Sequence, residues 1–206
     1  MKKKKISKNW LAKHKKDQFF TQSKIHGFRS RSSFKLIEMN NKFKFLQKNS
    51  LLLDLGSSPG GWSQVASKII SKGKILSVDI KEMENINKVD FIKGNCFEQK
   101  TYEKIKNYFN NEKINVLISD MAANTSGNKS LDSYNTGELC LNAMNLAIQI
   151  LHNDGVFISK LFMGSIFTEI HEKANKYFKK VIKYKPSSSK KESKEVYIYC
   201  KGFLKV

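Results

Sequence analysis

Lys160 is an unusual residue in this sequence, because it lies in an otherwise apolar stretch, GVFISKLF, at residues 155–162. An ammonium group in an apolar environment costs several kcal/mol or loses its proton unless it finds a partner. A lone lysine at the end of a strand can also extend its side chain to water, and for a lone lysine that is the better interpretation. The residues that could join Lys160 therefore decide between a surface lysine and a site.

Polar residues end or follow several other apolar runs. Asp54, Asp79 and Asp120 lie at the ends of such runs, and Asn95 lies just beyond another. In a parallel α/β sheet, ligands bind at the carboxyl ends of the strands. We therefore expect these four side chains and Lys160 to face one binding site.

The turn DLGSSPGGW, residues 54–62, comes directly after the first apolar run and opens a predicted helix. Glycines let the backbone approach a ligand closely, and this turn supplies three candidate cofactor-binding glycines, Gly56, Gly60 and Gly61. The spacing differs from the GxGxxG fingerprint, which disfavours a nicotinamide cofactor. Asp79 follows ~20 residues later, where a ribose-binding carboxylate belongs. The turn and this acid together predict a nucleoside cofactor.

The elements that must position these residues alternate along the chain. Short apolar runs predict seven strands, at residues 51–55, 75–80, 89–92, 114–120, 155–162, 180–184 and 196–200. Helix-like segments lie at residues 32–46, 61–71, 98–110, 136–152 and 165–178. This alternation predicts an α/β fold with a seven-stranded, mostly parallel sheet and helices on both faces. The last strand should be antiparallel, because the Ser/Lys-rich loop before it is short for a parallel crossover.

The charge of the chain indicates a polyanionic partner. The 206 residues suit one domain, and their formal net charge is +20. Residues 1–35 hold ten lysines and two arginines against one acid, with aromatic residues between them. Basic groups for phosphates and rings for stacking suit RNA. We predict a basic, partly flexible RNA-binding arm at residues 1–32 and a single domain at residues 33–206, with the other lysines forming a solvated surface.

The sequence also disfavours several classes of protein. No apolar run reaches the ~18 residues of a membrane span, and no apolar region of a signal peptide follows the basic N-terminus. Three cysteines, Cys96, Cys140 and Cys200, lie far apart and suit buried thiols in a reducing cytoplasm. We expect a cytoplasmic protein with no metal ion and no membrane partner. We also expect a monomer, because no apolar stripe suggests a second copy.

Five stretches resemble the FtsJ-like ribosomal RNA 2′-O-methyltransferases: RSRSSFKL, DLGSSPGGWSQ, SDMAANTSG, FISKLF and SKEVYIYC. The resemblance runs from about Gly27 to the C-terminus. It implies a Rossmann-like methyltransferase domain at residues 33–206 and S-adenosylmethionine as the cofactor. It also implies the catalytic set Lys35, Asp120, Lys160 and Glu195.

The resemblance implies cofactor contacts at Gly60 and Trp62 in the glycine turn, at Asp79 and at Asp120. One further position departs from the family pattern. Asn95 stands where an aspartate usually accepts a hydrogen bond from the adenine amine. An asparagine carbonyl can accept the same bond without the charge that strengthens it, so we expect weaker adenine affinity. Ala123 replaces a usual proline and Ser33 a usual bulky residue. Neither change removes a catalytic group, but both could alter how the RNA lies.

Methyl transfer to a ribose hydroxyl is an in-line displacement. Positioning of the reactants lowers its barrier by up to ~7–11 kcal/mol, and a general base raises the rate by ~10²–10⁴-fold. Lys160 can act as the base only if its pKa is lowered. Lys35 and the cofactor sulfonium favour the neutral amine, whereas Asp120 and Glu195 favour the ammonium, so the protonation state stays open. We interpret Lys160 as the base or steering group. Asp120 and Glu195 then hold it, and Lys35 contacts hydroxyl or phosphate.

The motif after the fourth strand indicates an oxygen acceptor. Amino-methyltransferases usually carry Asn/Asp-Pro-Pro-aromatic there, whereas this chain has DMAA, and no cysteine lies nearby for cytosine-C5 chemistry. The family target is a uridine in the peptidyl-transferase loop of large-subunit ribosomal RNA. Two alternatives stay open: methylation of tRNA or another RNA, and a non-catalytic ribosome-assembly protein on the same scaffold.

Overall fold

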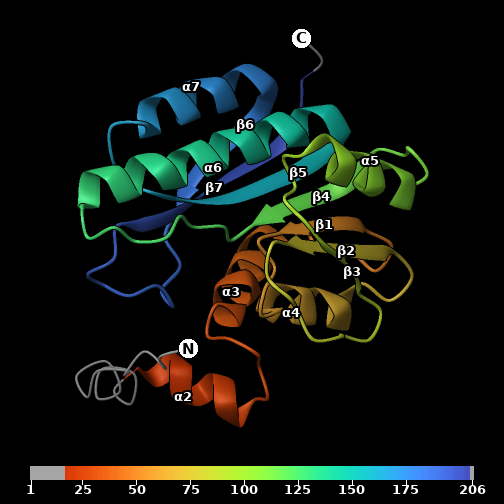
Figure 1. The fold of residues 1–206 in the computed structure, drawn as a ribbon, viewed down its shortest axis with the longest axis horizontal. Helices are drawn as coiled ribbons and strands as arrows, with labels where there is room; N and C mark the ends of the chain where they lie inside the picture. Colours follow the sequence, from red (N-terminus) through yellow and green to blue (C-terminus); the bar gives the residue numbers. More distant parts are fainter. Residues whose placement is uncertain (1–16, 205–206) are drawn as a thin grey trace.

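A computed structural model describes residues 17–204, which contain a seven-stranded sheet in the order β3-β2-β1-β4-β5-β7-β6 (Figure 1). The strands are β1 (Leu51–Leu55), β2 (Lys74–Asp79), β3 (Asp90–Lys93), β4 (Ile114–Ser119), β5 (Leu151–Phe162), β6 (Phe178–Tyr184) and β7 (Glu195–Phe203). The first five pair in parallel, and β7 pairs antiparallel with both β5 and β6. The predicted mostly parallel sheet with an antiparallel last strand is confirmed.

Helices cover both faces of the sheet, as predicted. They are α2 (Gln18–Ile25), α3 (Ser33–Phe43), α4 (Gly61–Ile69), α5 (Gln99–Tyr108), α6 (Lys129–Ile150) and α7 (Phe167–Tyr177). Helices α3 and α4 lie on one side of the sheet, and α6 and α7 lie on the other (Figure 1). Strand β1 shows why both sides are covered: Leu52 packs into the core under α3 and α4, whereas Leu53 and Leu55 pack into the core under α5 and α6.

Helix α6 and strand β5 differ from the predicted boundaries. The predicted helix begins at residue 136, whereas α6 begins at Lys129 because the Asn128 side chain accepts from the backbone amides of Ser130 and Leu131. This cap is polar, so hydrophobic periodicity does not reveal it. Strand β5 follows α6 directly at Leu151, ahead of the predicted start at residue 155. Its pairing with β4 shifts register between Ile114, which lies opposite Leu151, and Val116, which lies opposite Val156.

The predicted arm lies partly outside the described residues, because residues 1–16 are not among them. Its described part contains α2, a helix absent from the sequence-based prediction. Asp17 caps this helix by accepting from the amide of Phe20. The ring of Phe34 on α3 lies 5.5 Å from that of Phe19 and 5.4 Å from that of Phe28. This part of the arm therefore packs on the domain through its aromatic residues.

The described residues contain neither a membrane-spanning helix nor a group of metal-binding side chains. Within residues 17–204, no helix has the length and apolar character needed to cross a membrane. In the same part of the chain, no three His, Cys, Asp or Glu side chains are grouped so that they could hold a metal ion. The three cysteines are buried and unpaired there.

Candidate active site

The glycine turn joins β1 to α4, and its glycines are required by packing against other parts of the protein. Gly56 has a φ of 72°, and a Cβ there would overlap the side chain of Met121. A Cβ on Gly61 would overlap the hydroxyl of Ser30. Gly60 has a φ of 103°, a backbone conformation that L side chains rarely adopt. The turn is thus pressed between the segment after β4 and the end of the arm.

Asp54, at the start of the turn, is a buried acid with an unsatisfied oxygen. Its Oδ2 accepts from the Ser63 hydroxyl at 2.5 Å, while its Oδ1 has no hydrogen-bond partner. Burial raises the pKa of Asp54 to about 7, with a hydrogen bond from Ser63 opposing the shift and the charges of Asp120 and Asp79 adding to it. The hydroxyl of Ser57 is also buried and unpartnered. An acid and a hydroxyl in this condition fit a cationic ligand, and S-adenosylmethionine carries both an ammonium and a sulfonium group.

Asp79 and Asn95 lie together beside the turn, as their strand-end positions predict. Asp79 ends β2, and its carboxylate accepts from the amides of Ser58 at 2.9 Å and Lys81 at 2.8 Å. The carbonyl of Asp79 accepts from the amide of Gly94, next to Asn95. The Asn95 Oδ1 accepts from the amide of Phe97 at 3.1 Å, which fixes this carbonyl oxygen while leaving it a second lone pair. These two residues could hold the ribose and the adenine of the cofactor.

Lys35, Asp120, Lys160 and Glu195 converge in one cluster. Lys160 Nζ lies 3.6 Å from Asp120 Oδ1 and 3.2 Å from Glu195 Oε2, while Lys35 Nζ lies 2.6 Å from Glu195 Oε1. Each of the four side chains is less than a fifth exposed. The antiparallel pairing of β5 with β7 brings Glu195 opposite Phe162, two residues after Lys160. The sequence prediction that these residues meet is matched by this geometry, while their catalytic role stays a prediction.

The charges in the cluster favour the ammonium form of Lys160. Burial lowers the pKa of Lys160, but the neighbouring Asp120 and Glu195 raise it by a larger amount. The pKa of Lys160 therefore lies above its ordinary value, and the group is an ammonium. Burial raises the pKa of Glu195, and the two lysines outweigh this effect and bring it down to about 2. Of the opposing influences that the sequence could not rank, the carboxylates prevail.

Tyr197 belongs to the cluster and was missed by the sequence analysis. Its hydroxyl donates to Asp120 Oδ1 at 2.7 Å, and its fully buried ring lies 5.7 Å from Lys35 Nζ. The signal was available: a tyrosine predicted to be buried in a strand needs a partner for its hydroxyl.

Trp62 lies under the same cluster. Its ring packs 5.7 Å from that of Tyr197, and its indole nitrogen donates to the carbonyl of Ser32. These contacts are those of a core residue, and the cofactor contact of Trp62 stays a prediction.

Arg29, at the end of the arm, was also missed. Its guanidinium donates to the carbonyls of Pro59 at 3.2 Å, Glu84 at 2.6 Å and Asn85 at 2.7 Å. It thereby ties the glycine turn to the loop after β2. The sequence gives no sign of this contact, because an arginine in a basic arm is first read as a phosphate ligand.

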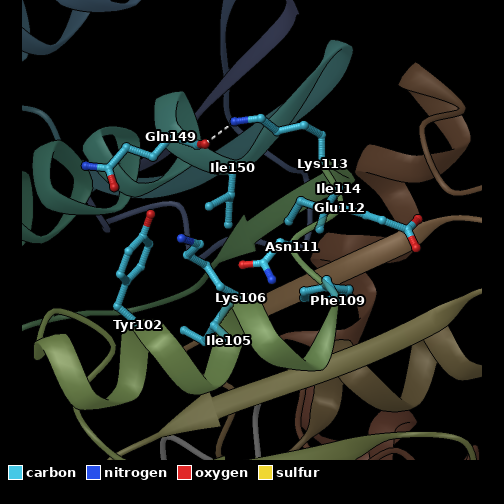
Figure 2. Close-up of a pocket in the computed structure, with 10 residues that line it drawn as sticks. All are labelled: Tyr102, Ile105, Lys106, Phe109, Asn111, Glu112, Lys113, Ile114, Gln149 and Ile150. Atoms are coloured by element: carbon cyan, nitrogen blue, oxygen red, sulfur yellow. Dashed lines mark hydrogen bonds between the residues drawn. The ribbon is translucent and has the colours of Figure 1, made fainter.

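A separate pocket lies at the amino ends of the strands, between α5, the start of β4 and the end of α6 (Figure 2). Its wall is largely apolar, with Ile105, Ile114 and Ile150, and Lys113 donates to the carbonyl of Gln149 at its rim. Ile114 is the first residue of β4, so this pocket faces the amino end of the strands. It is remote from the cluster at the carboxyl ends and contains none of the predicted residues.

Comparison with known proteins identifies the family of the chain. A model of the family described as FtsJ-like methyltransferase matches residues 28–203. Ribosomal RNA large subunit methyltransferase E of Pelagibacter ubique is 47% identical over 201 residues, with 98% of each chain covered. The protein of the same name from Marinobacter nauticus is 40% identical over 200 residues, with 97% of each covered.

Solved structures share the fold of this chain. A putative ribosomal RNA methyltransferase from Plasmodium falciparum superposes with a TM-score of 0.79 at 34% identity, covering 87% of this chain and 100% of that one. A putative methyltransferase from Streptococcus mutans in complex with SAH, at 16% identity, shares the fold with a TM-score of 0.53, covering 84% of this chain and 96% of that one. A family match over residues 28–203, with relatives this similar along almost the whole chain, shows that the chain belongs to the FtsJ-like methyltransferases.

Proposed function

We propose that this protein transfers a methyl group from S-adenosylmethionine to the 2′-hydroxyl of a ribose in large-subunit ribosomal RNA. The observation that supports this most is the cluster of Lys35, Asp120, Lys160 and Glu195 at the same edge of the sheet as the glycine turn. The names of the relatives from Pelagibacter ubique and Marinobacter nauticus supply the RNA class. As the finer target we propose a uridine in the peptidyl-transferase loop.

The charge of Lys160 favours a steering role over that of a base. S-adenosylmethionine supplies the methyl group on a positively charged sulfur, and transfer to oxygen leaves a neutral thioether. An ammonium cannot accept a proton, but it can donate a hydrogen bond to the acceptor oxygen and direct a lone pair along the line of attack. Asp120 and Glu195 hold Lys160 in place from two sides.

The proton of the acceptor hydroxyl needs only a weak base in this scheme. As the oxygen gains the methyl group, its remaining proton becomes strongly acidic, so a carboxylate can accept it. Asp120 is the carboxylate next to the ammonium of Lys160. Lys35, paired with Glu195, is available to contact the hydroxyl or an adjacent phosphate. In this scheme one O–CH₃ bond forms, one S–CH₃ bond breaks, and the proton of the hydroxyl passes to the protein.

We further propose that the RNA is bound by residues 1–32, the basic arm, together with the domain formed by residues 33–206. The charge of the arm and its aromatic content support this. In its described part, Lys68 of α4 lies 4.8 Å from the ring of Phe28 and adds a positive charge beside the aromatic residues. We propose that the protein acts as a cytoplasmic monomer.

Incubation of the protein with radiolabelled S-adenosylmethionine and unmodified large ribosomal subunits tests the proposed function. We expect one labelled 2′-O-methyl group per subunit, with the nucleotide identified by mapping, and no label on tRNA. Lys160→Ala should lower the rate by about 100-fold, the size of effect that misplacing a reacting group produces. A rate within a few-fold of the wild type, or label on tRNA alone, would contradict the proposal. Calorimetry with S-adenosylmethionine distinguishes a methyltransferase, which binds the cofactor, from a non-catalytic scaffold, which would not.

A further inference from the structure

The loop between β6 and β7, residues 185–194, is fastened to α3 although its composition is that of a flexible surface loop. We call it the serine loop. Within it, Ser188 is 1% exposed and Ser189 is 6% exposed. Small polar side chains are buried to this extent only when their hydrogen bonds are satisfied, so partners of the serine loop must exist elsewhere in the chain.

Glu38 is the main partner. Its Oε1 accepts from the Tyr184 hydroxyl at 2.6 Å and from the Ser187 amide at 2.7 Å. Its Oε2 accepts from the Ser187 hydroxyl at 2.8 Å and from the amide and hydroxyl of Ser188 at 3.2 and 3.3 Å. Burial raises the pKa of Glu38, but these bonds outweigh it and the pKa is lowered, so the carboxylate is charged. Glu38 thus anchors the loop by four bonds and the end of β6 by a fifth.

Arg31 fastens the serine loop from a second direction. Its Nη2 donates to the carbonyl of Ser188 at 2.5 Å, and its Nη1 pairs with Asp17, the residue that caps α2. Because Glu38 is one helical turn after Lys35, α3 holds both the loop and a member of the cluster. The loop therefore has a fixed place relative to Lys35.

Ser189 connects the serine loop to the cluster. Its hydroxyl donates to Glu195 Oε1 at 2.8 Å, the oxygen that also receives Lys35 at 2.6 Å. With two donors on Oε1, the other oxygen of Glu195 is turned toward Lys160, whose Nζ lies 3.2 Å from it. Without Ser189, only Lys35 and Lys160 would hold the Glu195 carboxylate, and both are long, flexible side chains.

We propose that Ser189 and Glu38 are positioning residues for methyl transfer, with Glu38 holding the serine loop so that Ser189 can orient the Glu195 carboxylate toward Lys160. This inference rests on the proposed function, because it assigns the two residues an effect through Glu195 and Lys160. Neither residue contacts the reacting atoms. Their effect should therefore be on the turnover step rather than on the binding of cofactor or RNA.

Ser189→Ala tests the connection to Glu195. We expect kcat to fall about 10-fold, the typical effect of losing one hydrogen bond to a charged group, with KM for S-adenosylmethionine unchanged within about twofold. Ser189→Thr, which keeps the hydroxyl, should restore most of the rate. Ser71→Ala, at an exposed serine outside the site, is the control.

Combining Ser189→Ala with Glu195→Ala shows whether Ser189 acts through Glu195. In Glu195→Ala, measured by single-turnover kinetics with enzyme in excess, adding Ser189→Ala should change the rate by less than about twofold. A further fall as large as in the wild type would overturn the proposal, because Ser189 would then act elsewhere.

Glu38→Gln tests the anchor. The amide nitrogen would face donors where the wild type offers an acceptor, so we expect the same loss of kcat as in Ser189→Ala. Glu192→Gln is the matched control, because Glu192 is exposed in the same loop and the substitution changes the charge equally. An equal effect of both substitutions, or none from Glu38→Gln, would overturn the proposal.

A readout independent of activity separates this inference from the proposed function. Carbon-13 NMR of the Glu195 carboxyl, followed from about pH 1 to pH 6, should give a higher titration midpoint in Ser189→Ala than in the wild type. An unchanged midpoint overturns the positioning role, whatever the activity. If the midpoint shifts but wild-type protein methylates no RNA, the proposed function fails while the contact between Ser189 and Glu195 stands.

Discussion

Asp54→Asn should remove a pH-dependent penalty on folding that arises from the buried acid under the glycine turn. Asp54 is 1% exposed and its pKa is raised from 3.8 to about 7. Between these two values the unfolded chain releases the proton of Asp54 while the folded chain keeps it. The stability of the wild type therefore falls as pH rises from about 4 to about 7, and the loss is complete above that range.

The magnitude follows from the size of the shift. A difference of about three pKa units corresponds to about 4 kcal/mol at 1.36 kcal/mol per unit. The hydrogen bond from Ser63 to Asp54 can persist in the asparagine variant, but a new buried N–H group without a partner would cost about 1–3 kcal/mol. At pH 8 the two effects leave Asp54→Asn more stable than the wild type by about 1–3 kcal/mol. At pH 4 only the cost remains, and the variant is the less stable protein.

Urea denaturation at several pH values between 4 and 8, followed by tryptophan fluorescence, measures this crossover. Calorimetry at pH 8, where Asp54 is ionised in the wild type, should show weaker binding of S-adenosylmethionine to Asp54→Asn, because the ligand loses a negative partner. Stability gained at the expense of ligand binding is a common trade-off at functional sites. If the unfolding free energies of variant and wild type run parallel from pH 4 to pH 8, the assignment of the raised pKa to Asp54 is refuted.

Two further substitutions examine the cluster and the turn. Glu195→Gln should lower stability at pH 7 by about 3 kcal/mol, since the folded pKa of about 2 lies below the ordinary value of 4.5 for a glutamate. This difference is present above pH 4.5 and shrinks as pH falls toward 2, which denaturation curves at pH 7, 4 and 3 would show; a constant difference would count against the pairing with the two lysines. Gly61→Ala should lower stability by about 1–3 kcal/mol, because the new Cβ would overlap the Ser30 hydroxyl, and an unchanged melting temperature would show that this contact yields without cost.

The strands and the residues at their carboxyl ends could be predicted from the sequence for a physical reason. Buried parallel strands are continuous apolar runs, so a charged residue that ends one is visible against its surroundings. Lys160 and Asp120 are of this kind, and the sheet brings them to 3.6 Å from one another. Lys35 and Glu195 do not follow from strand ends alone. They were placed by the resemblance of their flanking motifs.

The polar contacts that join distant segments could not be predicted. Glu38 meets Ser187 across 149 residues of sequence, and neither residue takes part in a periodic pattern. The protonation of Lys160 also depends on distances, because burial and the two carboxylates act in opposite directions. Helix α2 was missed because its sequence, QFFTQSKI, shows no amphipathic periodicity, and its cap is a single aspartate.

The two arginines of the arm alter the interpretation of its charge. Arg29 donates to three backbone carbonyls around the glycine turn, and Arg31 donates to the serine loop and pairs with Asp17. These guanidinium groups are therefore bound to the protein, which leaves the lysines as the groups to meet phosphates. Arg29 holds the glycine turn, and Arg31 holds the serine loop, whose Ser189 donates to Glu195. The end of the arm is thus fastened to both sides of the proposed site, in addition to any contact it makes with RNA.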